Sequence, residues 1–190
     1  MIRKIIVKEL ETLKLALKGW ELNIKGLRSN NKGEWWLLIQ SAIILLHLIK
    51  LNSLIIKINL SSNLIFHVIG IITIVYGTYL MIYSFKSLGA SLSPLPEPKK
   101  GSKLVVDLAY KKCRHPLYKS LIICSLGTAI YLISIYHLIL FSLLCFVLRS
   151  KAIREESSLI IKHSNYLDYM SKVPAIIQFV PYLDWRKEIR

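Results

Sequence analysis

The sequence predicts an all-α fold class: a polytopic integral membrane helical bundle with about four membrane segments, a C-terminal helical hairpin and an N-terminal interfacial amphipathic helix. The first observation behind this prediction is composition, since 54% of the 190 residues are hydrophobic, against ~45–50% in soluble domains. The second is length, because 190 residues allow one domain. Without a second core, the excess of apolar side chains is expected to face lipid. The third is the net charge of +15, because its Lys and Arg lie between and beside the apolar runs, as in cytoplasmic loops of membrane proteins.

The first predicted unit, residues 1–33, is a basic amphipathic segment. Apolar residues such as Leu10, Leu13 and Leu17 fall near helical spacing, and most lysines fall elsewhere on the helix. This pattern predicts a helix lying in the membrane interface; a solvated helix packed on the rest of the protein is the alternative. The segment does not resemble a signal peptide, because it lacks a small-residue cleavage site and carries Glu9.

The second predicted unit, residues 34–190, is the membrane domain. Its first apolar run, 35–49, begins with two tryptophans, which are typical of the headgroup level. The run is short of the ~20 residues that a span needs, but it can extend to Leu51 or further if the Lys50 side chain reaches back to the interface. Residues 54–60 contain a lysine and are predicted to be an extracytoplasmic or interfacial link.

Residues 63–85 are predicted to form a clear membrane span. Gly70 and Gly77 lie within it. Small residues in a membrane helix let a neighbouring helix approach closely, although glycines that are merely tolerated in lipid are an equal alternative.

A long polar loop and a helical hairpin follow this span. Three prolines exclude a helix from 93–98, and 99–112 are polar and basic. The apolar stretch 117–148 is too long for one span, so we expect a tight break near 134–137. The second helix of this hairpin is expected to leave the membrane and continue into 157–163.

The distribution of positive charge predicts the topology. Lys and Arg are frequent before residue 34, between 86 and 114 and after 149, and sparse in the two intervening connections. Both termini and the long loop are therefore expected on the cytoplasmic side of a multi-pass protein. This topology brings the polar residues around 114 and 155 to the same side.

Other classes are disfavoured by the sequence. No basic face with interleaved aromatics suggests nucleic-acid binding. The three cysteines have neither disulfide-framework nor zinc-site spacing, so no metal site is predicted. Cys113 stands beside Arg114 and His115, which can lower a thiol pKa, although an unreactive loop cysteine is the more common case.

Polar and aromatic residues on this side form an ordered set. Taken singly, each has an ordinary explanation: Arg and His can anchor on lipid phosphates, a glutamate pair can sit on a solvated helix face, and tyrosines can be interfacial. In chain order the set is Tyr110, Arg114-His115-Pro116-Leu117-Tyr118, Glu155-Glu156, Tyr166-x-x-Tyr169 and Val173-Pro174.

This ordered set resembles the C-terminal signature of the isoprenylcysteine carboxyl methyltransferase and phospholipid methyltransferase-like membrane family. The resemblance covers roughly residues 110–181. The chain departs from the family pattern at three places: Ser120 stands where glycine is usual, His163-Ser164 replaces a Phe-Gly pair, and Ala175 stands where arginine often follows Val-Pro.

The resemblance implies a methyltransferase that uses S-adenosylmethionine, held between the Arg-His-Pro loop and the Glu-Glu helix. It also implies a lipid-like or prenylated acceptor that arrives from the bilayer. The implied catalytic residues are Arg114, His115 and Glu155. The implied cofactor-binding residues are Tyr110, His115, Pro116, Leu117, Tyr118, Glu155 and Glu156, and the implied acceptor-binding residues are Arg154, Tyr166 and Tyr169.

Two other classes remain as alternatives. Membrane reductases of the sterol type share an Arg-His-Pro, but they typically continue with Asn-Tyr and Gly-Glu, which 117–120 do not match. A non-enzymatic small membrane protein is the other alternative, and the departures at Ser120 and Ala175 favour it mildly. The sequence leaves the chemical class of the acceptor and the oligomeric state open.

Overall fold

The computed structural model describes residues 24–30, 32–49, 63–97 and 103–186. The regular elements within these ranges are all helical, which confirms the all-α prediction. Most of the predicted N-terminal interfacial helix and the predicted link at 54–60 lie outside the described residues, so both stay predictions. Of the first unit, the structure describes the short helix α2 (Ile24–Ser29) and the turn that follows it.

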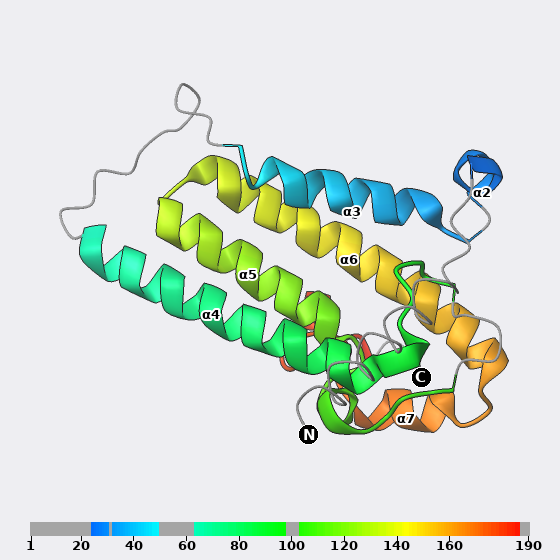
Figure 1. The fold of residues 1–190 in the computed structure, drawn as a ribbon. Coiled ribbons are helices and arrows are strands. Elements are labelled where there is room, and N and C mark those ends of the chain that lie inside the picture. Colours follow the sequence, from blue (N-terminus) through cyan, green and yellow to red (C-terminus); the bar gives the residue numbers. More distant parts are fainter. Residues whose placement is uncertain (1–23, 31, 50–62, 98–102, 187–190) are drawn as a thin grey trace, which may run out of the picture.

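Four helices lie side by side and give the molecule its shape (Figure 1). In spatial order they are α4 (Asn63–Leu88), α5 (Pro116–Leu132), α6 (Ile135–Lys162) and α3 (Glu34–Leu46). The short helix α7 (Tyr166–Lys172) and the 3-10 turns η1 (Gly89–Ser91), η2 (Leu108–Lys111) and η3 (Pro181–Leu183) lie toward one end of this row.

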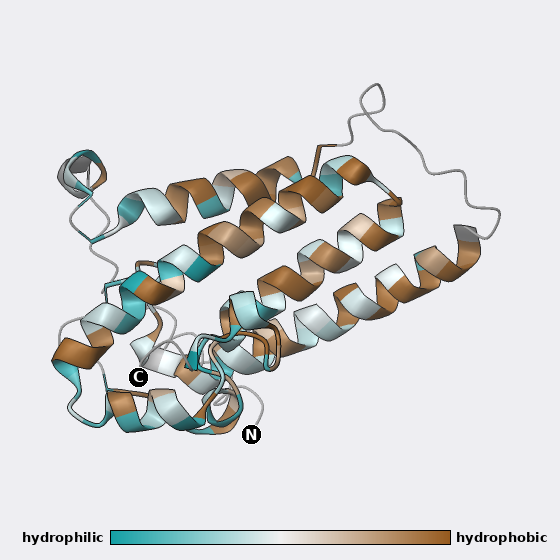
Figure 2. Cartoon of the chain, turned by 180° about the vertical axis from the view of Figure 1, so that it is seen from behind, coloured by the Kyte–Doolittle hydropathy of each residue, from teal (hydrophilic) through white to brown (hydrophobic). Residues whose placement is uncertain are grey.

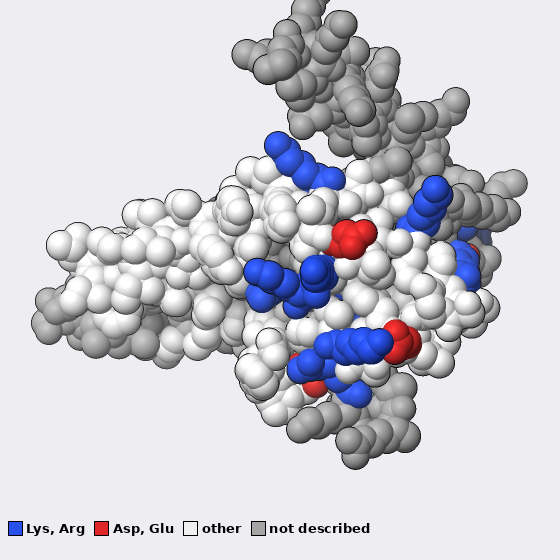
Figure 3. Space-filling model, turned by 90° about the horizontal axis from the view of Figure 1, so that it is seen from below, with Lys and Arg blue, Asp and Glu red and all other residues white. Residues whose placement is uncertain are grey.

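Two of these helices are long and apolar enough to cross a membrane by length and composition: Leu64–Leu88 and Ile135–Lys162. The helices α3 and α5 are apolar but shorter, so the count of four spans stays a prediction. Large hydrophobic side chains are exposed along α4, including Leu64 and Ile72, and the helices are predominantly brown in Figure 2. Viewed from below, Lys and Arg gather over one half of the molecule, whereas the described residues of the protruding half carry no charge (Figure 3). We call the first half the charged end.

The contact between α4 and α5 depends on glycines. A Cβ atom added at Gly70 would lie 2.7 Å from the Cα of Tyr131, and one at Gly127 would lie 2.9 Å from the backbone nitrogen of Ile74. A Cβ at Gly77 would meet the Cys124 sulfur at 2.6 Å. The prediction that Gly70 and Gly77 permit close helix packing is therefore confirmed.

The predicted hairpin is formed by α5 and α6. Its break falls at Ile133 and Ser134, so it begins one residue before the predicted 134–137 and is shorter. Ile133 has a φ of 45°, which ends α5, and Ser134 caps α6 by accepting a hydrogen bond from the backbone N–H of His137. As predicted, α6 runs beyond its apolar part and ends at Lys162.

The tail after α7 folds back onto the charged end. The backbone N–H of Ile176 donates to the Leu183 carbonyl at 3.0 Å, which closes a loop. Ala175 and Ile176 are fully buried. The described part of the Pro-rich loop, 93–97, is non-helical as predicted, and the Ser91 hydroxyl donates to the Lys103 carbonyl.

Candidate functional site

The predicted motif residues meet at the charged end, where α5 begins and α6 ends. Pro116 is the first residue of α5, a position that loses no hydrogen bond because a helical N–H there has no partner within the helix. The residues just before it are fixed by the tail: the N–H of Arg114 donates to the Pro174 carbonyl and that of His115 to the Ala175 carbonyl, each at 2.9 Å.

Glu156 is the centre of a buried polar network. Its Oε1 accepts from Arg114 Nε at 2.6 Å and from His115 Nε2 at 2.9 Å, and its Oε2 accepts from Trp185 Nε1 at 2.6 Å. The side chains of Arg114 and Glu156 are 0% and 1% exposed. A buried charge needs such pairing and hydrogen bonding to be tolerated, so the four side chains form one structural unit.

Arg114 also fastens this network to the end of α7. Its Nη1 donates to the carbonyls of Met170 and Val173. The guanidinium lies over the Trp185 ring, 5.7 Å from the centroid. All three guanidinium nitrogens of Arg114 donate hydrogen bonds within the protein. Arg114 therefore orders the polypeptide from α7 to the tail and does not act as a lipid anchor.

Glu155, the neighbouring carboxylate, has a different environment. It is about a quarter exposed (28%) and accepts a hydrogen bond from the Tyr118 hydroxyl at 2.8 Å. The Tyr118 ring stacks on His115 with centroids 5.2 Å apart, and His115 Nδ1 lies 3.8 Å from Glu155 Oε2.

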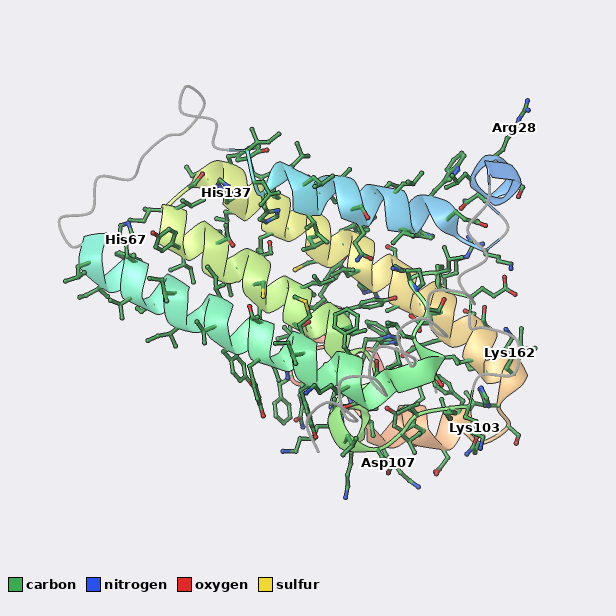
Figure 4. The ribbon with its side chains drawn as sticks, viewed as in Figure 1. Arg28, His67, Lys103, Asp107, His137 and Lys162 are labelled. Atoms are coloured by element: carbon green, nitrogen blue, oxygen red, sulfur yellow. The ribbon has the colours of Figure 1, made fainter. Side chains whose placement is uncertain are left out.

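A pocket opens beside Glu155. Among its described lining residues Glu155 is the single carboxylate, and the rest are aromatic, apolar or basic groups and serines from α4, the Pro-rich loop, η2, α5, α6 and α7. The lining is Leu88, Ser91, Ser93, Leu95, Lys103, Leu104, Val105, Tyr110, Arg114, His115, Leu117, Tyr118, Glu155, Leu159, His163, Tyr166 and Tyr169. In Figure 4 the labelled Lys103 and Lys162 mark this end, whereas His67 and His137 mark the opposite end of the helices.

Most of the predicted site residues therefore come together. Three of them do not line the pocket: Pro116 is buried at the start of α5, Glu156 is enclosed in its network, and Arg154 bonds the Asn30 carbonyl at 3.3 Å. Tyr169 lines the pocket and also donates to the Tyr110 carbonyl at 2.6 Å.

Sequence reasoning missed two parts of the site. Trp185 has no spacing that ties it to Glu156, and only its isolation in a charged tail could have drawn attention to it. Residues within 88–95 and 103–105 line the pocket from the side of α4; their serines and leucines carry no motif. Of the departures, Ser120 is fully buried and donates to the Leu117 carbonyl.

Ionisation of the buried phenols and of Cys113 is disfavoured. Burial, then the charge of Glu155, raises the pKa of Tyr110 far above its usual value, and burial likewise raises the pKa values of Tyr166 and Tyr169. Burial raises the pKa of the Cys113 thiol to about 11. The idea that Arg114 and His115 activate this thiol is therefore wrong, because desolvation outweighs their charge.

A buried lysine lies next to the pocket wall. Lys151, 2% exposed, donates to Gln40 Oε1 on α3 at 2.7 Å and lies 5.2 Å from the centroid of the Tyr118 ring. These partners are neutral, so Lys151 links α3 to the pocket without forming an ion pair shorter than 4 Å with any described carboxylate.

A row of apolar helices, two of them long and apolar enough to cross a membrane, is typical of a class, the helical integral membrane proteins, and the polar pocket at one end is its candidate binding site. The chain belongs to the phospholipid methyltransferase family, whose sequence model matches residues 65–163, just over half of the chain. It is similar to the protein-S-isoprenylcysteine O-methyltransferase of Schizosaccharomyces pombe (strain 972 / ATCC 24843), with 31% identity over 109 residues, 55% of this chain and 46% of that relative. The chain thus aligns with less than half of that relative's length. The resemblance seen in the sequence is confirmed at the level of the family.

Proposed function

We propose that the protein is an S-adenosylmethionine-dependent methyltransferase that acts on a lipid-like acceptor. The observation that carries this proposal is the position of Glu155: a partly exposed carboxylate, oriented by Tyr118, that faces an aromatic pocket at the end of apolar helices. Membership of a methyltransferase family implies a methyl donor, and the chemistry of the pocket supports this particular one.

The pocket lining fits the donor. A carboxylate accepts strong hydrogen bonds from vicinal hydroxyls such as those of a ribose, and Glu155 is the one carboxylate in the described lining. The aromatic rings of Tyr110, Tyr118, Tyr166 and Tyr169 suit a sulfonium cation through their negative faces. When bound, S-adenosylmethionine would supply an electrophilic methyl group, and these side chains would orient it.

The residues of the chain would contribute chiefly by position. For an ionised carboxylate acceptor no base is required, so exclusion of water and alignment account for the rate. An amine or hydroxyl acceptor must lose a proton, and His115 Nδ1, whose ring is held at Nε2 by Glu156, is the atom suited to take it. Glu155, 3.8 Å away, would stabilise the resulting imidazolium. Arg114 would act at a distance, by keeping Glu156 and the tail in place.

We also propose that the acceptor enters from the bilayer. The helices leading to the pocket expose apolar side chains, so a lipid tail can lie against them while its head reaches the pocket. The charge distribution supports a multi-pass topology with both termini in the cytoplasm, and in that topology the pocket would lie at the cytoplasmic surface.

Donor binding is the deciding experiment. The purified protein in detergent or nanodiscs is titrated with S-adenosylmethionine and, separately, with a nicotinamide cofactor. We expect saturable binding of the first alone, weakened by Glu155→Gln. Binding of the nicotinamide would favour the reductase alternative, and binding of neither would favour a non-enzymatic protein.

Acceptor class is tested next. Radiolabelled methyl transfer is measured to a farnesylcysteine analogue, to phosphatidylethanolamine and to their tail-less head groups. The lipidated acceptors should react better, because a tail positions the head. Equal methylation of a water-soluble head group would contradict entry from the bilayer.

A further inference from the structure

The tail carries a surface loop with an unusual composition for a solvent-facing turn. Residues 177–182 lie between Ile176 and Leu183, which close the loop by their backbone hydrogen bond. Phe179, at its tip, is 85% exposed, and Val180 and Tyr182 are also exposed. Phe179 has a φ of 66°, a conformation uncommon for a bulky residue and often associated with function.

The loop is held against α6 at the position of Arg149. Arg149 Nε donates to the Tyr182 carbonyl at 2.8 Å, and the guanidinium lies over the Tyr182 ring at 4.8 Å. Arg149 is the first charged residue after the apolar run of α6, so it marks the level at which this helix leaves the hydrocarbon. An arginine with neighbouring aromatic rings is typical of that level.

The loop also lies on the side of α6 that faces lipid. Leu143 and Phe146 are 47% and 56% exposed, and Arg149 follows them at steps of three residues, which places all three on one helix face. The opposite face, with Leu144 and Leu148, is buried.

We infer that the loop 177–182 is a membrane anchor, whose Phe179 and Tyr182 insert into the boundary between headgroups and acyl chains of the leaflet at the charged end. The partner is the lipid bilayer itself. An exposed apolar tip there is removed from water by lipid, and a nearby cation is attracted to the phosphates. This function is separate from methyl transfer, because it does not depend on what the pocket binds.

The test measures the depth of the loop tip in a bilayer. Phe179→Cys in the full chain carries a nitroxide label, and the protein is reconstituted into vesicles of phosphatidylcholine and phosphatidylglycerol. Power saturation compares collisions with oxygen, which concentrates in lipid, and with a polar nickel chelate. We expect oxygen collisions to dominate, at a depth of roughly 5–10 Å below the phosphates.

Ile161→Cys is the matched control. Ile161 is equally exposed (87%) but lies one residue from the end of α6, beyond the level of Arg149, so nickel collisions should dominate there. The wild-type chain, labelled in parallel, reports the background from the three native cysteines. If the label at 179 gives the same collision ratio as the label at 161, the loop is in water and the inference is wrong.

Discussion

At the scale of single residues, two adjacent carboxylates have opposite environments. Successive residues on a helix point about 100° apart, so Glu155 faces the pocket while Glu156 faces the core. From the sequence alone, both glutamates were predicted to bind the cofactor. The structure separates a partly exposed group with one hydrogen-bond donor from a buried group with donors from three side chains.

Substituting each carboxylate by its amide should separate the two environments. Glu156→Gln leaves the buried Arg114 without its counter-charge and should destabilise the fold by about 3–5 kcal/mol. Glu155→Gln should leave stability unchanged and weaken S-adenosylmethionine binding by about 1.5–3 kcal/mol. Thermal unfolding and donor titration of both variants provide the comparison. If Glu156→Gln folds normally and loses only donor affinity, Glu156 belongs to the binding surface instead.

The Cys113 thiol gives a pH-dependent prediction. Its folded pKa, about 11, lies above its ordinary 9.0, so the folded state keeps a proton that the unfolded state releases. Its contribution to stability is complete below pH 9 and is lost as the pH rises toward 11. Stability measured between pH 8.5 and 10.5 should therefore fall less steeply in Cys113→Ala than in wild type. Identical slopes would mean that the thiol ionises freely in the folded state.

The site could be predicted in part from sequence. The charge distribution and the order of the motifs were sufficient to predict that Arg114, His115 and Tyr118 lie near the Glu pair. The reason is that the hairpin of α5 and α6 returns the chain to the end at which α5 begins. The role of Trp185 could not be predicted, since a contact made by an irregular tail depends on its folded path and leaves no periodic signal. For the same reason the pocket wall formed by residues within 88–95 and 103–105 was missed.

At the scale of elements, the contact between α4 and α5 is one of close backbone approach at Gly70, Gly77 and Gly127. In a membrane, apolar side chains gain little by leaving lipid, so close backbone approach at small residues is what holds helices together. Gly127→Val adds carbons where a Cβ would already lie 3.0 Å from the Gly70 carbonyl oxygen.

We expect Gly127→Val to destabilise the bundle by about 1–3 kcal/mol, the usual cost of overpacking. Thermal unfolding in micelles measures this. Ile71→Val, on the exposed side of α4, is the control and should be nearly neutral. If Gly127→Val leaves the free energy of unfolding unchanged, close approach of α4 and α5 does not stabilise the bundle.

The link between α3 and the pocket makes another prediction. Lys151 is buried with neutral partners, so its charge is costly to keep out of water. Lys151→Met preserves volume and removes the charge, and it should leave stability unchanged or raise it by up to ~1–4 kcal/mol. Lys151→Ala, which leaves a cavity, should be less stable than Lys151→Met. Equal losses in both would mean that the ammonium itself stabilises the fold.

Helices with a strong apolar signal were predicted best. The bounds of α4 and the extent of α6 followed from hydropathy, and the non-helical Pro-rich loop followed from backbone chemistry. The short elements η2 and α7 were not predicted, because their 4 and 7 residues are too few to show a helical period. Their conformations depend on contacts such as that between Tyr169 and the Tyr110 carbonyl.

At the scale of the whole molecule, the two ends of the helix row differ in charge, and this predicts opposite sides of the membrane. Leu64, 76% exposed, is the second residue of α4 at one end of the row. The exposed Asp107 precedes η2 at the other end (Figure 4). In sealed vesicles of one orientation, a membrane-impermeant thiol reagent should label Leu64→Cys and Asp107→Cys from opposite sides. Labelling of both from one side would contradict a spanning α4.

The hydrogen bonds from Arg114 and His115 to Pro174 and Ala175 have a consequence for biosynthesis. All the described apolar helices precede residue 163 in the chain, whereas the segment that orders the start of α5 and supplies Trp185 is translated after them. A chain truncated after α6 would keep all the described apolar helices, but it would lose the Trp185 donor to Glu156 and the two α7 tyrosines that line the pocket. The pocket is therefore completed only when this last segment to be synthesised folds back onto helices that precede it in the chain.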